Sequence, residues 1–403
     1  MVDFSITPLG VICHLQTFGI LSARRMHPLV RVEEIEGPYG RFAIGERAIQ
    51  RLWAAHEVRG PLLTLTGTPI EVLNPGDWNR SGGPDFLGAE LKIDGQRRRG
   101  DVEIHLRWDD WNAHGHQRNP NFNGVILHAV LLPGAKPIQT AQQQEPETII
   151  LLPYLPRDLE DLAEEDALLD LRGRAGDVAR RVLHLEPNIA QGLRRRAIQR
   201  FEAKAQHAQT RINTRGWEQA CHELCLEALG LGGNRAPMSE LAQTYKPSEM
   251  ILLGTDKLYL EKTGRWRLRG LRPAGHPHRR LSQYLELLRR RPQWHEAVRT
   301  WSETPAEIAL NEHRRALIDQ ILAQVIPDGR TDTLCINALL PLTHHPQNSQ
   351  LEKWLNWPPG NFPEDLHEAR LRLGLVGASR NWEIQGILDI LRRTAGQAVP
   401  PPA

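Results

Sequence analysis

The chain has 403 residues, of which 40% are hydrophobic and 24% charged, and its 50 Lys and Arg nearly balance its 48 Asp and Glu. This composition is typical of a folded protein with two or three domains, and it excludes a disordered or collagen-like chain. The apolar runs are far shorter than the roughly 18 residues of a membrane span, and four cysteines are too few for a disulfide framework, so we expect a cytoplasmic protein without a membrane partner.

The N-terminal segment has the weakest pattern. Residues 1–39 are interpreted as an extension, and residues 1–25 are expected to be loosely ordered or to precede a true start at Met26. The apolar stretch of this segment is interrupted by His14 and Gln16 and has no basic residues before it, which is not typical of a signal peptide.

Residues 40–155 predict a domain with a mixed sheet and one flanking helix, and residues 44–58 have the apolar spacing of that helix. Asp94-Gly95 favours the positive φ values of a tight turn and therefore predicts a hairpin between its two flanking strands. About five strands are expected in all, at residues 62–66, 69–73, 84–93, 97–108 and 125–132.

Residues 156–403 predict one or two helical domains, so the whole chain is expected to be α+β. Cys221 and Cys225 fall on the apolar stripe of one predicted helix and are interpreted as core residues, not as metal ligands. Glycines 230–233 follow that helix and are interpreted as its stop, not as a phosphate-binding loop. Helical spacing is found at residues 158–170, 189–210, 217–229, 277–290, 305–325 and 382–394.

Basic residues concentrate in this helical half. Between Gln191 and Pro292 there are 20 Lys and Arg against 9 Asp and Glu, and 43 of the 50 basic residues of the chain are Arg. Arg pairs with phosphate groups and stacks on bases, so a nucleic-acid-binding face is one interpretation and a set of solvated helix surfaces is the other. The candidate nucleic-acid-binding residues are Arg194, Arg195, Arg196, Arg265, Arg267, Arg269, Arg272, Arg279 and Arg280.

A candidate site lies within the predicted sheet. Polar and apolar residues alternate from residue 100 to 106, so Asp101, Glu103 and His105 are expected on one face of a strand. The hairpin partner of this strand begins at Asp85. Because converging carboxylates suit Mg²⁺ or Mn²⁺, Asp85 and Glu103 are predicted to be the metal ligands.

The placement of Asp85 and Glu103 resembles the core of the PD-(D/E)xK nucleases. This resemblance implies that both carboxylates hold a divalent metal and that a Lys two residues after the Glu orients the attacking water. His105 stands in place of that Lys, a departure that preserves, alters or abolishes hydrolysis. Asp85 followed by Glu90-Leu91-Lys92 matches the literal motif better. Asp85 and Glu90, however, are five residues apart, so in a regular strand their side chains point to opposite faces unless a bulge at Gly88 intervenes.

Further polar residues are candidates for the same site. The resemblance implies a Glu from the preceding helix, for which Glu46 and Glu57 are both available. His114 and His116 are candidates for metal binding or proton transfer, and so is His128, although a single His in a strand is more often a hydrogen-bonded structural residue. Asp101 is expected to act as an outer-shell group.

Over nearly its whole length the chain is similar to an uncharacterised bacterial family of unknown function. This resemblance implies no activity. It rests on Gly83-Pro84-Asp85-Phe86, Gly100-Asp101-Val102-Glu103-Ile104-His105, Asp110-Trp111-Asn112-Ala113-His114-Gly115-His116, Asn123-Gly124-Val125-Ile126-Leu127-His128, Leu271-Arg272-Pro273-Ala274 and Pro277-His278-Arg279-Arg280-Leu281.

The expected function is metal-dependent cleavage of nucleic acid. In this hypothesis Asp85 and Glu103 bind Mg²⁺ or Mn²⁺, His105 positions or deprotonates water, and the basic helical half holds the phosphate backbone. The alternative is a catalytically inactive, nuclease-like protein that binds nucleic acid or acts as a scaffold. A third interpretation is a hydrolase of a small phosphorylated molecule with a His-rich metal site, which would need a closed pocket.

Overall fold

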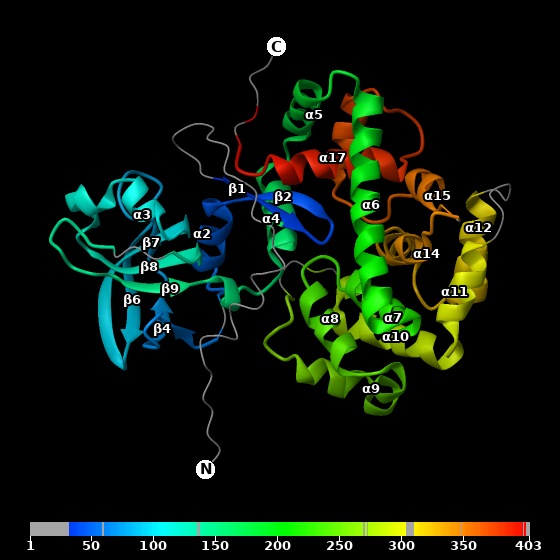
Figure 1. Ribbon diagram of the computed structural model, residues 1–403, viewed down its shortest axis with the longest axis horizontal. Helices are drawn as coiled ribbons and strands as arrows, with labels where there is room; N and C mark the ends of the chain where they lie inside the picture. The colour runs from blue at the N-terminus through cyan, green and yellow to red at the C-terminus, as the bar shows by residue number, and fades with distance from the viewer. Residues whose placement is uncertain are drawn as a thin grey trace. The chain divides into compact units, whose positions relative to one another are not determined.

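The computed structural model describes residues 32–58, 60–134, 138–268, 271, 273–303, 310–347, 349–397 and 399. The chain divides into two compact units, of which the first contains residues 32–36, 42–166 and 395–397 and the second contains residues 37–41 and 167–394 (Figure 1). Residues 1–31 of the predicted extension lie outside the described residues, whereas residues 32–37 form a strand.

The first unit is built on a mixed sheet. Seven strands of the described chain take part, in the order β3-β4-β6-β7-β8-β9 with β5 beside β6. The neighbours from β3 to β7 are antiparallel, whereas β8 is parallel to both β7 and β9. The strands are β3 (Leu62–Leu63), β4 (Pro69–Asn74), β5 (Asp77–Trp78), β6 (Phe86–Ile93), β7 (Gln96–Arg107), β8 (Val125–Leu132) and β9 (Glu147–Ile150), and β1 (Val32–Gly37) pairs with β2 (Gly40–Gly45) in a separate sheet.

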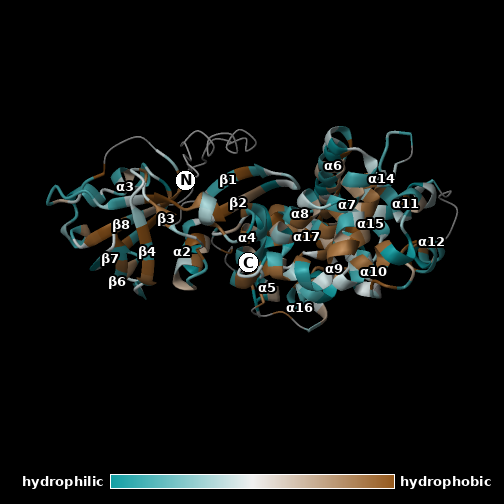
Figure 2. Cartoon of the chain, turned by 90° about the horizontal axis from the view of Figure 1, so that it is seen from below, coloured by the Kyte–Doolittle hydropathy of each residue, from teal (hydrophilic) through white to brown (hydrophobic). Residues whose placement is uncertain are grey.

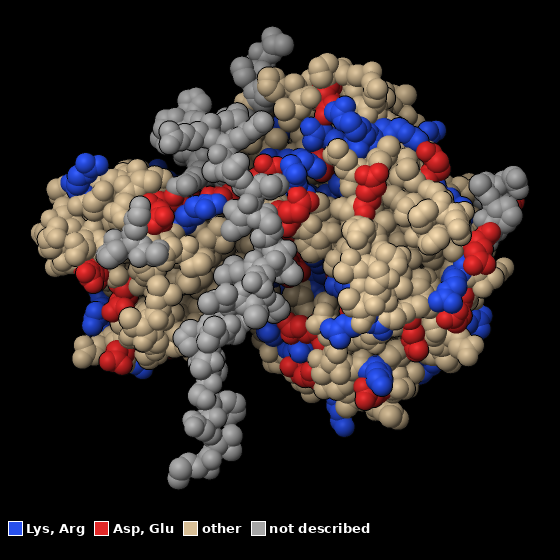
Figure 3. Space-filling view, in the orientation of Figure 1, with Lys and Arg blue, Asp and Glu red and all other residues tan. Residues whose placement is uncertain are grey.

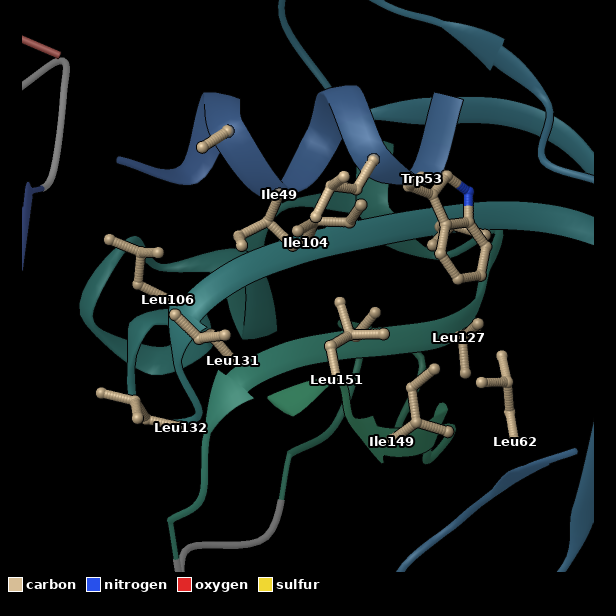
Figure 4. Packing of buried hydrophobic residues seen from close by; sticks show 14 of the residues in the cluster. Ile49, Trp53, Leu62, Ile104, Leu106, Leu127, Leu131, Leu132, Ile149 and Leu151 are labelled. Atoms are coloured by element: carbon tan, nitrogen blue, oxygen red, sulfur yellow. The ribbon is translucent and has the colours of Figure 1, made fainter. Parts of the chain in front are cut away.

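One face of this sheet packs against helix α2 (Glu46–Ala54). Ile49 and Trp53 of the helix point toward apolar side chains of β7 and β8, among them Ile104 and Leu127 (Figure 4). Ile104 is 1% exposed, as expected for the apolar side of the alternating strand. Burying this face places the alternate residues of β7 on the opposite face of the sheet.

The opposite face is covered by the connection between β7 and β8. This connection contains α3 (Asp110–Ala113) and the short helices η1 (His116–Arg118) and η2 (Pro120–Phe122). A connection of this length is required because parallel neighbours cannot be joined by a tight turn. Its aromatic residues form a second core with side chains of β8 and its surroundings, namely Trp108, Trp111, Phe122, Val125, Val130 and Ile138.

Two local features of the β6–β7 hairpin depend on glycines. Asp94 and Gly95 have φ values of 48° and 76°, so the predicted tight turn is confirmed. Gly88 has a φ of 65°, and the pairing of β6 with β7 shifts register between Phe86 and Ala89. Gly88 is therefore the site of a β-bulge, three residues after Asp85.

The second unit is helical, and hydrophobic and hydrophilic residues are mixed along its helices (Figure 2). Its longest helix, α6, packs along α17, and a Cβ on Gly386 of α17 would lie 2.5 Å from the carbonyl oxygen of Leu193. The helices are α5 (Ala175–Leu185), α6 (Ile189–Arg215), α7 (Trp217–Leu229), α8 (Arg235–Thr244), α9 (Pro247–Glu261), α10 (Pro277–Arg290), α11 (Trp294–Ser302), α12 (Leu310–Ala316), α13 (Asp328–Leu334), α14 (Leu340–Thr343), α15 (Leu351–Asn356), α16 (Glu364–Arg372) and α17 (Asn381–Arg393), after α4 (Leu159–Asp170) in the linking segment.

The predicted α+β class, with a sheet and a flanking helix followed by a mainly helical half, is confirmed. Cys221 and Cys225 are buried core residues of α7, and that helix ends at Leu229 directly before Gly230, as predicted. None of the helices in the described part of the chain is both long and apolar enough to cross a membrane.

Candidate functional site

The alternation of β7 places Glu103 and His105 on the face that the connecting segment covers. In the parallel pairing of β7 with β8, Glu103 lies opposite His128 and His105 lies opposite Val130. Side chains at paired positions share one face of a sheet, so His128 joins Glu103 and His105. The connecting segment adds His114 and His116 from above.

His105 is the centre of this group. Its Nε2 atom lies 3.2 Å from His114 Nδ1, 3.3 Å from His116 Nε2 and 3.3 Å from Glu103 Oε1. Glu103 Oε1 lies a further 3.3 Å from His116 Nε2. The four side chains Glu103, His105, His114 and His116 are referred to as the histidine cluster, and its three imidazoles are arranged so that they could hold a metal ion.

The histidine cluster is largely shielded from solvent. Glu103 is 6% exposed and His105 is 1% exposed, whereas His114 is exposed. The ring of His116 stacks on Phe122 with centroids 3.7 Å apart and meets Trp111 edge to face. The cluster thus opens to solvent on the side of His114, while aromatic rings close the side of His116.

His128 lies beneath the cluster. Its Nε2 atom is 2.9 Å from the Nδ1 atom of His105, and the residue is 0% exposed. Burial, together with the nearby His105, holds the pKa of His128 well below its ordinary value, so the ring is neutral. A neutral ring at this position accepts a hydrogen bond through Nε2 when the proton is on Nδ1.

Asp85 lies beside the cluster at the start of β6. Its backbone N–H donates to Glu103 Oε2 (3.0 Å), and its own oxygens accept from Gln50 Nε2 (2.8 Å) and from the backbone N–H of Ile104 (3.0 Å). Burial and the negative charge of Glu103 raise the pKa of Asp85. Burial acts in the same direction on Glu103, but hydrogen bonds from His105 and His116 outweigh it and lower the pKa of Glu103.

Asp101 contacts the bulge in β6. Its Oδ1 atom accepts the backbone N–H of Gly88 at the bulge (3.0 Å). A Cβ on Gly124 would lie 2.7 Å from its Oδ2 atom, so the side chain is closely confined. Asp101 thus stabilises the bulge at Gly88, and its expected outer-shell role stays a prediction.

Helix α2 contributes Glu46 and Gln50 on the side of Asp85. The charge of Glu46 adds to the increase in the pKa of Asp85, whereas Glu57 forms an ion pair with Arg157 (2.6 Å). Gln50, which the sequence analysis did not single out, lies one helical turn after Glu46 and donates to Asp85. A polar residue four positions after a candidate Glu on the same helix face is the signal that could have identified it.

The alternative motif Glu90-Leu91-Lys92 lies elsewhere. A bulge does occur at Gly88, which removes the regular-strand objection to this motif. Lys92, however, is exposed and pairs with Glu71 of β4 at 3.7 Å, and Glu90 lies opposite Arg99 of β7.

A family model described as "Protein of unknown function (DUF2851)" matches residues 46–254, which is more than half of the chain. The chain belongs to this family. The predicted membership of a family of unknown function is thereby confirmed, and the matched range includes α2, Asp85 and the complete histidine cluster. The chain matches no curated protein and no solved structure.

In this DUF2851 chain four of the nine predicted nucleic-acid-binding arginines have carboxylate partners, and acidic and basic side chains lie beside one another on the visible face of the helical unit (Figure 3). Arg195 and Arg196 pair with Glu186 at 2.8 and 2.6 Å. Arg194 pairs with Glu352, Arg265 pairs with Glu240, and Arg267 is partly exposed. Arg269 and Arg272 lie outside the described residues.

Arg279 and Arg280, at the start of α10, differ from these residues. Arg279 is exposed, whereas Arg280 is 4% exposed and donates to Gln283 (2.8 Å). Burial and the like charges of Arg330 and Arg279 lower the pKa of Arg280 to about 10. The buried Nε atoms of Arg280 and Arg330 have no hydrogen-bond partner among the described residues, and the like charges of Arg279 and Arg330 act on Arg280. Arg330 was not predicted from the sequence.

Proposed function

We propose that the protein is a metal-dependent hydrolase that cleaves phosphodiester bonds of nucleic acid. The observation that carries this proposal is the convergence of Glu103 and three imidazoles on one buried point beside Asp85. Carboxylates and imidazoles are the side chains that bind divalent metal ions in hydrolytic sites. A bound ion would polarise the phosphoryl group and activate water at neutral pH.

The neighbouring residues support this chemistry. Glu103 brings a carboxylate oxygen within 3.3 Å of two of the imidazoles, which favours the attraction of a cation. Asp85 offers a second carboxylate for proton transfer and is itself fixed by Gln50 and by the backbone of Ile104. Asp85 directly precedes β6 and Glu103 is in the adjacent strand β7, an arrangement that supports the proposed analogy with the PD-(D/E)xK nucleases.

The nucleic-acid part of the proposal draws on the charge of the helical half. The stretch between Gln191 and Pro292 has an excess of 11 positive charges, because 20 basic residues face 9 acidic ones. Where carboxylates already neutralise arginines, little attraction for phosphate remains. Arg279, Arg280 and Arg330 form a group of like charges near one another and are the phosphate-binding candidates that this proposal selects.

The proposal is tested by incubating the full-length protein with single- and double-stranded DNA and RNA in Mg²⁺, Mn²⁺ and Zn²⁺. The wild type is compared with Glu103→Ala and with the control His56→Asn, which changes an exposed histidine with a φ of 55° to a residue that tolerates this conformation. We expect cleavage that depends on the metal, is lost in Glu103→Ala and is retained in the control.

The competing hypothesis of an inactive nucleic-acid-binding protein predicts a different result. Such a protein would bind the same substrates without cleaving them in any of the three metals. Cleavage that is equal in Glu103→Ala and the wild type would refute the proposed site, because the activity would then come from elsewhere or from a contaminant.

A further inference from the structure

The contacts of His105 Nε2 cannot be explained by hydrogen bonds alone. Three polar atoms lie 3.2 to 3.3 Å from this one nitrogen, namely atoms of His114, His116 and Glu103. An imidazole nitrogen has either one proton or one lone pair, so it forms one good hydrogen bond. The distances are also at the long end of the range for nitrogen donors.

The same distances suit four ligands around one ion. Zinc binds imidazole nitrogen and carboxylate oxygen at about 2.0 Å, and a tetrahedron of that radius has edges of about 3.3 Å. Four of the six separations within the histidine cluster are 3.2, 3.3, 3.3 and 3.3 Å, and the group whose ligand atoms all lie close enough to hold one ion comprises the three imidazoles, with Glu103 beside two of them. The three candidate nitrogen atoms all lie within 4.8 Å of one another.

The other nitrogen of His105 has the partner that a metal ligand requires. Histidine ligands almost always donate their second ring N–H to a fixed acceptor, which sets the tautomer and the orientation of the ring. His105 Nδ1 lies 2.9 Å from His128 Nε2, and His128 is completely buried between β7 and its neighbours. With the proton on Nδ1, the lone pair of His105 Nε2 points to the centre of the cluster.

We infer that the histidine cluster is a single site for a transition-metal ion of the Zn²⁺ class, and that His128 orients His105 as its outer-shell partner. The ligand atoms are Glu103 Oε1, His105 Nε2, His114 Nδ1 and His116 Nε2. Imidazole prefers such ions over Mg²⁺, which takes oxygen ligands. Of the two predicted ions, Mg²⁺ is therefore disfavoured, and the predicted ligand Asp85 lies outside the site, next to Glu103.

The exposure of the ligands adds a functional detail to this site. His105, His116 and Glu103 are held by the sheet and by aromatic packing, whereas His114 is exposed on a short helix before Gly115, which has a φ of 80°. Catalytic zinc sites have three protein ligands and one exchangeable position. His114 occupies the exchangeable position, so a substrate oxygen replaces it from the solvent side. This detail rests on the proposed function, whereas metal binding itself does not.

The test measures metal binding and not activity. Full-length protein is stripped with a chelator, Zn²⁺ is titrated against a chromophoric competitor, and Co²⁺ is followed by its visible absorption, which is intense in four-coordinate sites. We expect one ion per chain and no displacement of Co²⁺ by excess Mg²⁺. His105→Ala is expected to abolish binding, and the control His56→Asn is expected to leave it unchanged.

Two further variants keep the test decisive if His105→Ala does not fold, as judged by circular dichroism. Glu103→Gln keeps one oxygen that can accept from the backbone of Asp85 and replaces the proposed ligand oxygen with an uncharged NH2 group that does not bind the ion, so we expect weaker Zn²⁺ binding in a folded protein. His128→Leu is expected to reduce the affinity for Zn²⁺ about 10- to 100-fold, because it removes the acceptor for His105. His128→Gln retains an acceptor and is expected to restore the affinity.

Three results would overturn the inference. These are a wild type that binds neither Zn²⁺ nor Co²⁺, a folded Glu103→Gln with unchanged affinity, and Mg²⁺ that displaces Co²⁺ at similar concentrations. Equal affinities of His128→Leu and the wild type would remove the outer-shell role. Zinc binding without cleavage of nucleic acid would refute the proposed function and leave the metal site established, so the two failures are distinguishable.

Discussion

His222 should make the stability of the helical unit depend on pH between about 7 and 4. This residue of α7 is 1% exposed, its Nδ1 atom lies 2.6 Å from the hydroxyl of Tyr284, and its Nε2 atom lies 2.9 Å from the carbonyl oxygen of Tyr245. The carbonyl can only accept, so Nε2 has the proton and Nδ1 accepts from the tyrosine. A second proton on the ring would break this arrangement.

The sign and size of the effect follow from these contacts. Burial lowers the pKa of His222 from 6.5 to about 4, against the opposing effect of its hydrogen bond to Tyr245. As the pH falls below 6.5, the unfolded chain takes up a proton at His222 before the folded chain does, so the free energy of unfolding decreases. The difference between the two pKa values corresponds to about 3 kcal/mol, most of which is lost by about pH 4.5.

Urea unfolding at about pH 7.5 and about pH 4.5, followed by circular dichroism, measures this loss. The variant His222→Gln can still accept from Tyr284 and donate to Tyr245 but does not titrate, so it should lose about 2 to 3 kcal/mol less than the wild type between the two pH values. The exposed His184 supplies the control His184→Gln, which should behave as the wild type does. Burial and Arg211 also lower the pKa of His207 to about 4, but its contribution is the same in all three proteins. An equal loss in the wild type and His222→Gln would refute the reasoning.

Three other predictions concern the sheet and the basic residues. Ile104→Ala should lower the free energy of unfolding by about 2 to 5 kcal/mol in urea, because it leaves a cavity under α2, and a loss below about 1 kcal/mol would contradict the packing. Gly100→Ala should cost about 1 to 3 kcal/mol in the same assay, because the new Cβ would lie 2.5 Å from Ile126 Cγ2, and an unchanged urea midpoint would count against the close approach. If the protein binds nucleic acid, Arg279→Ala should lower the slope of log affinity against log salt by about one, whereas Arg194→Ala, whose guanidinium is already paired, should not change it. Equal slopes for the two variants would argue against the selection of Arg279.

The local parts of the fold were predictable because their signals are local. The turn at Asp94-Gly95 and the polar and apolar faces of β7 follow from backbone preference and strand periodicity, and the structure confirms both. Strand β9 (Glu147–Ile150) was missed because four residues are too short to show a period. Helix α9 was missed because Gly254, with a φ of 76°, interrupts its helical pattern.

The contacts of the candidate site depend on register and crossover, which no short window of sequence contains. The sequence supplied Glu103, His105, His114 and His116 as candidates, but the pairing of Glu103 with His128 arises from the parallel alignment of β7 and β8. The prediction of Asp85 and Glu103 as metal ligands was made from their side chains alone and did not include backbone contacts. The N–H of Asp85 binds Glu103 Oε2, and both oxygens of Asp85 already accept hydrogen bonds.

The crossover from β7 to β8 also affects how much conformational entropy the chain loses when the site forms. All four members of the histidine cluster fall between residues 103 and 116, and their supporting partner His128 is only one strand further on. The entropy lost when a loop closes grows with the length of the loop. Because the four side chains are close in the sequence, little further entropy is lost once the loop between β7 and β8 has formed. All the residues that contact one another in this cluster belong to the first unit. The ligand set comes from one strand–loop–strand segment, and Asp85, directly before the neighbouring strand β6, holds Glu103 in place through its backbone N–H.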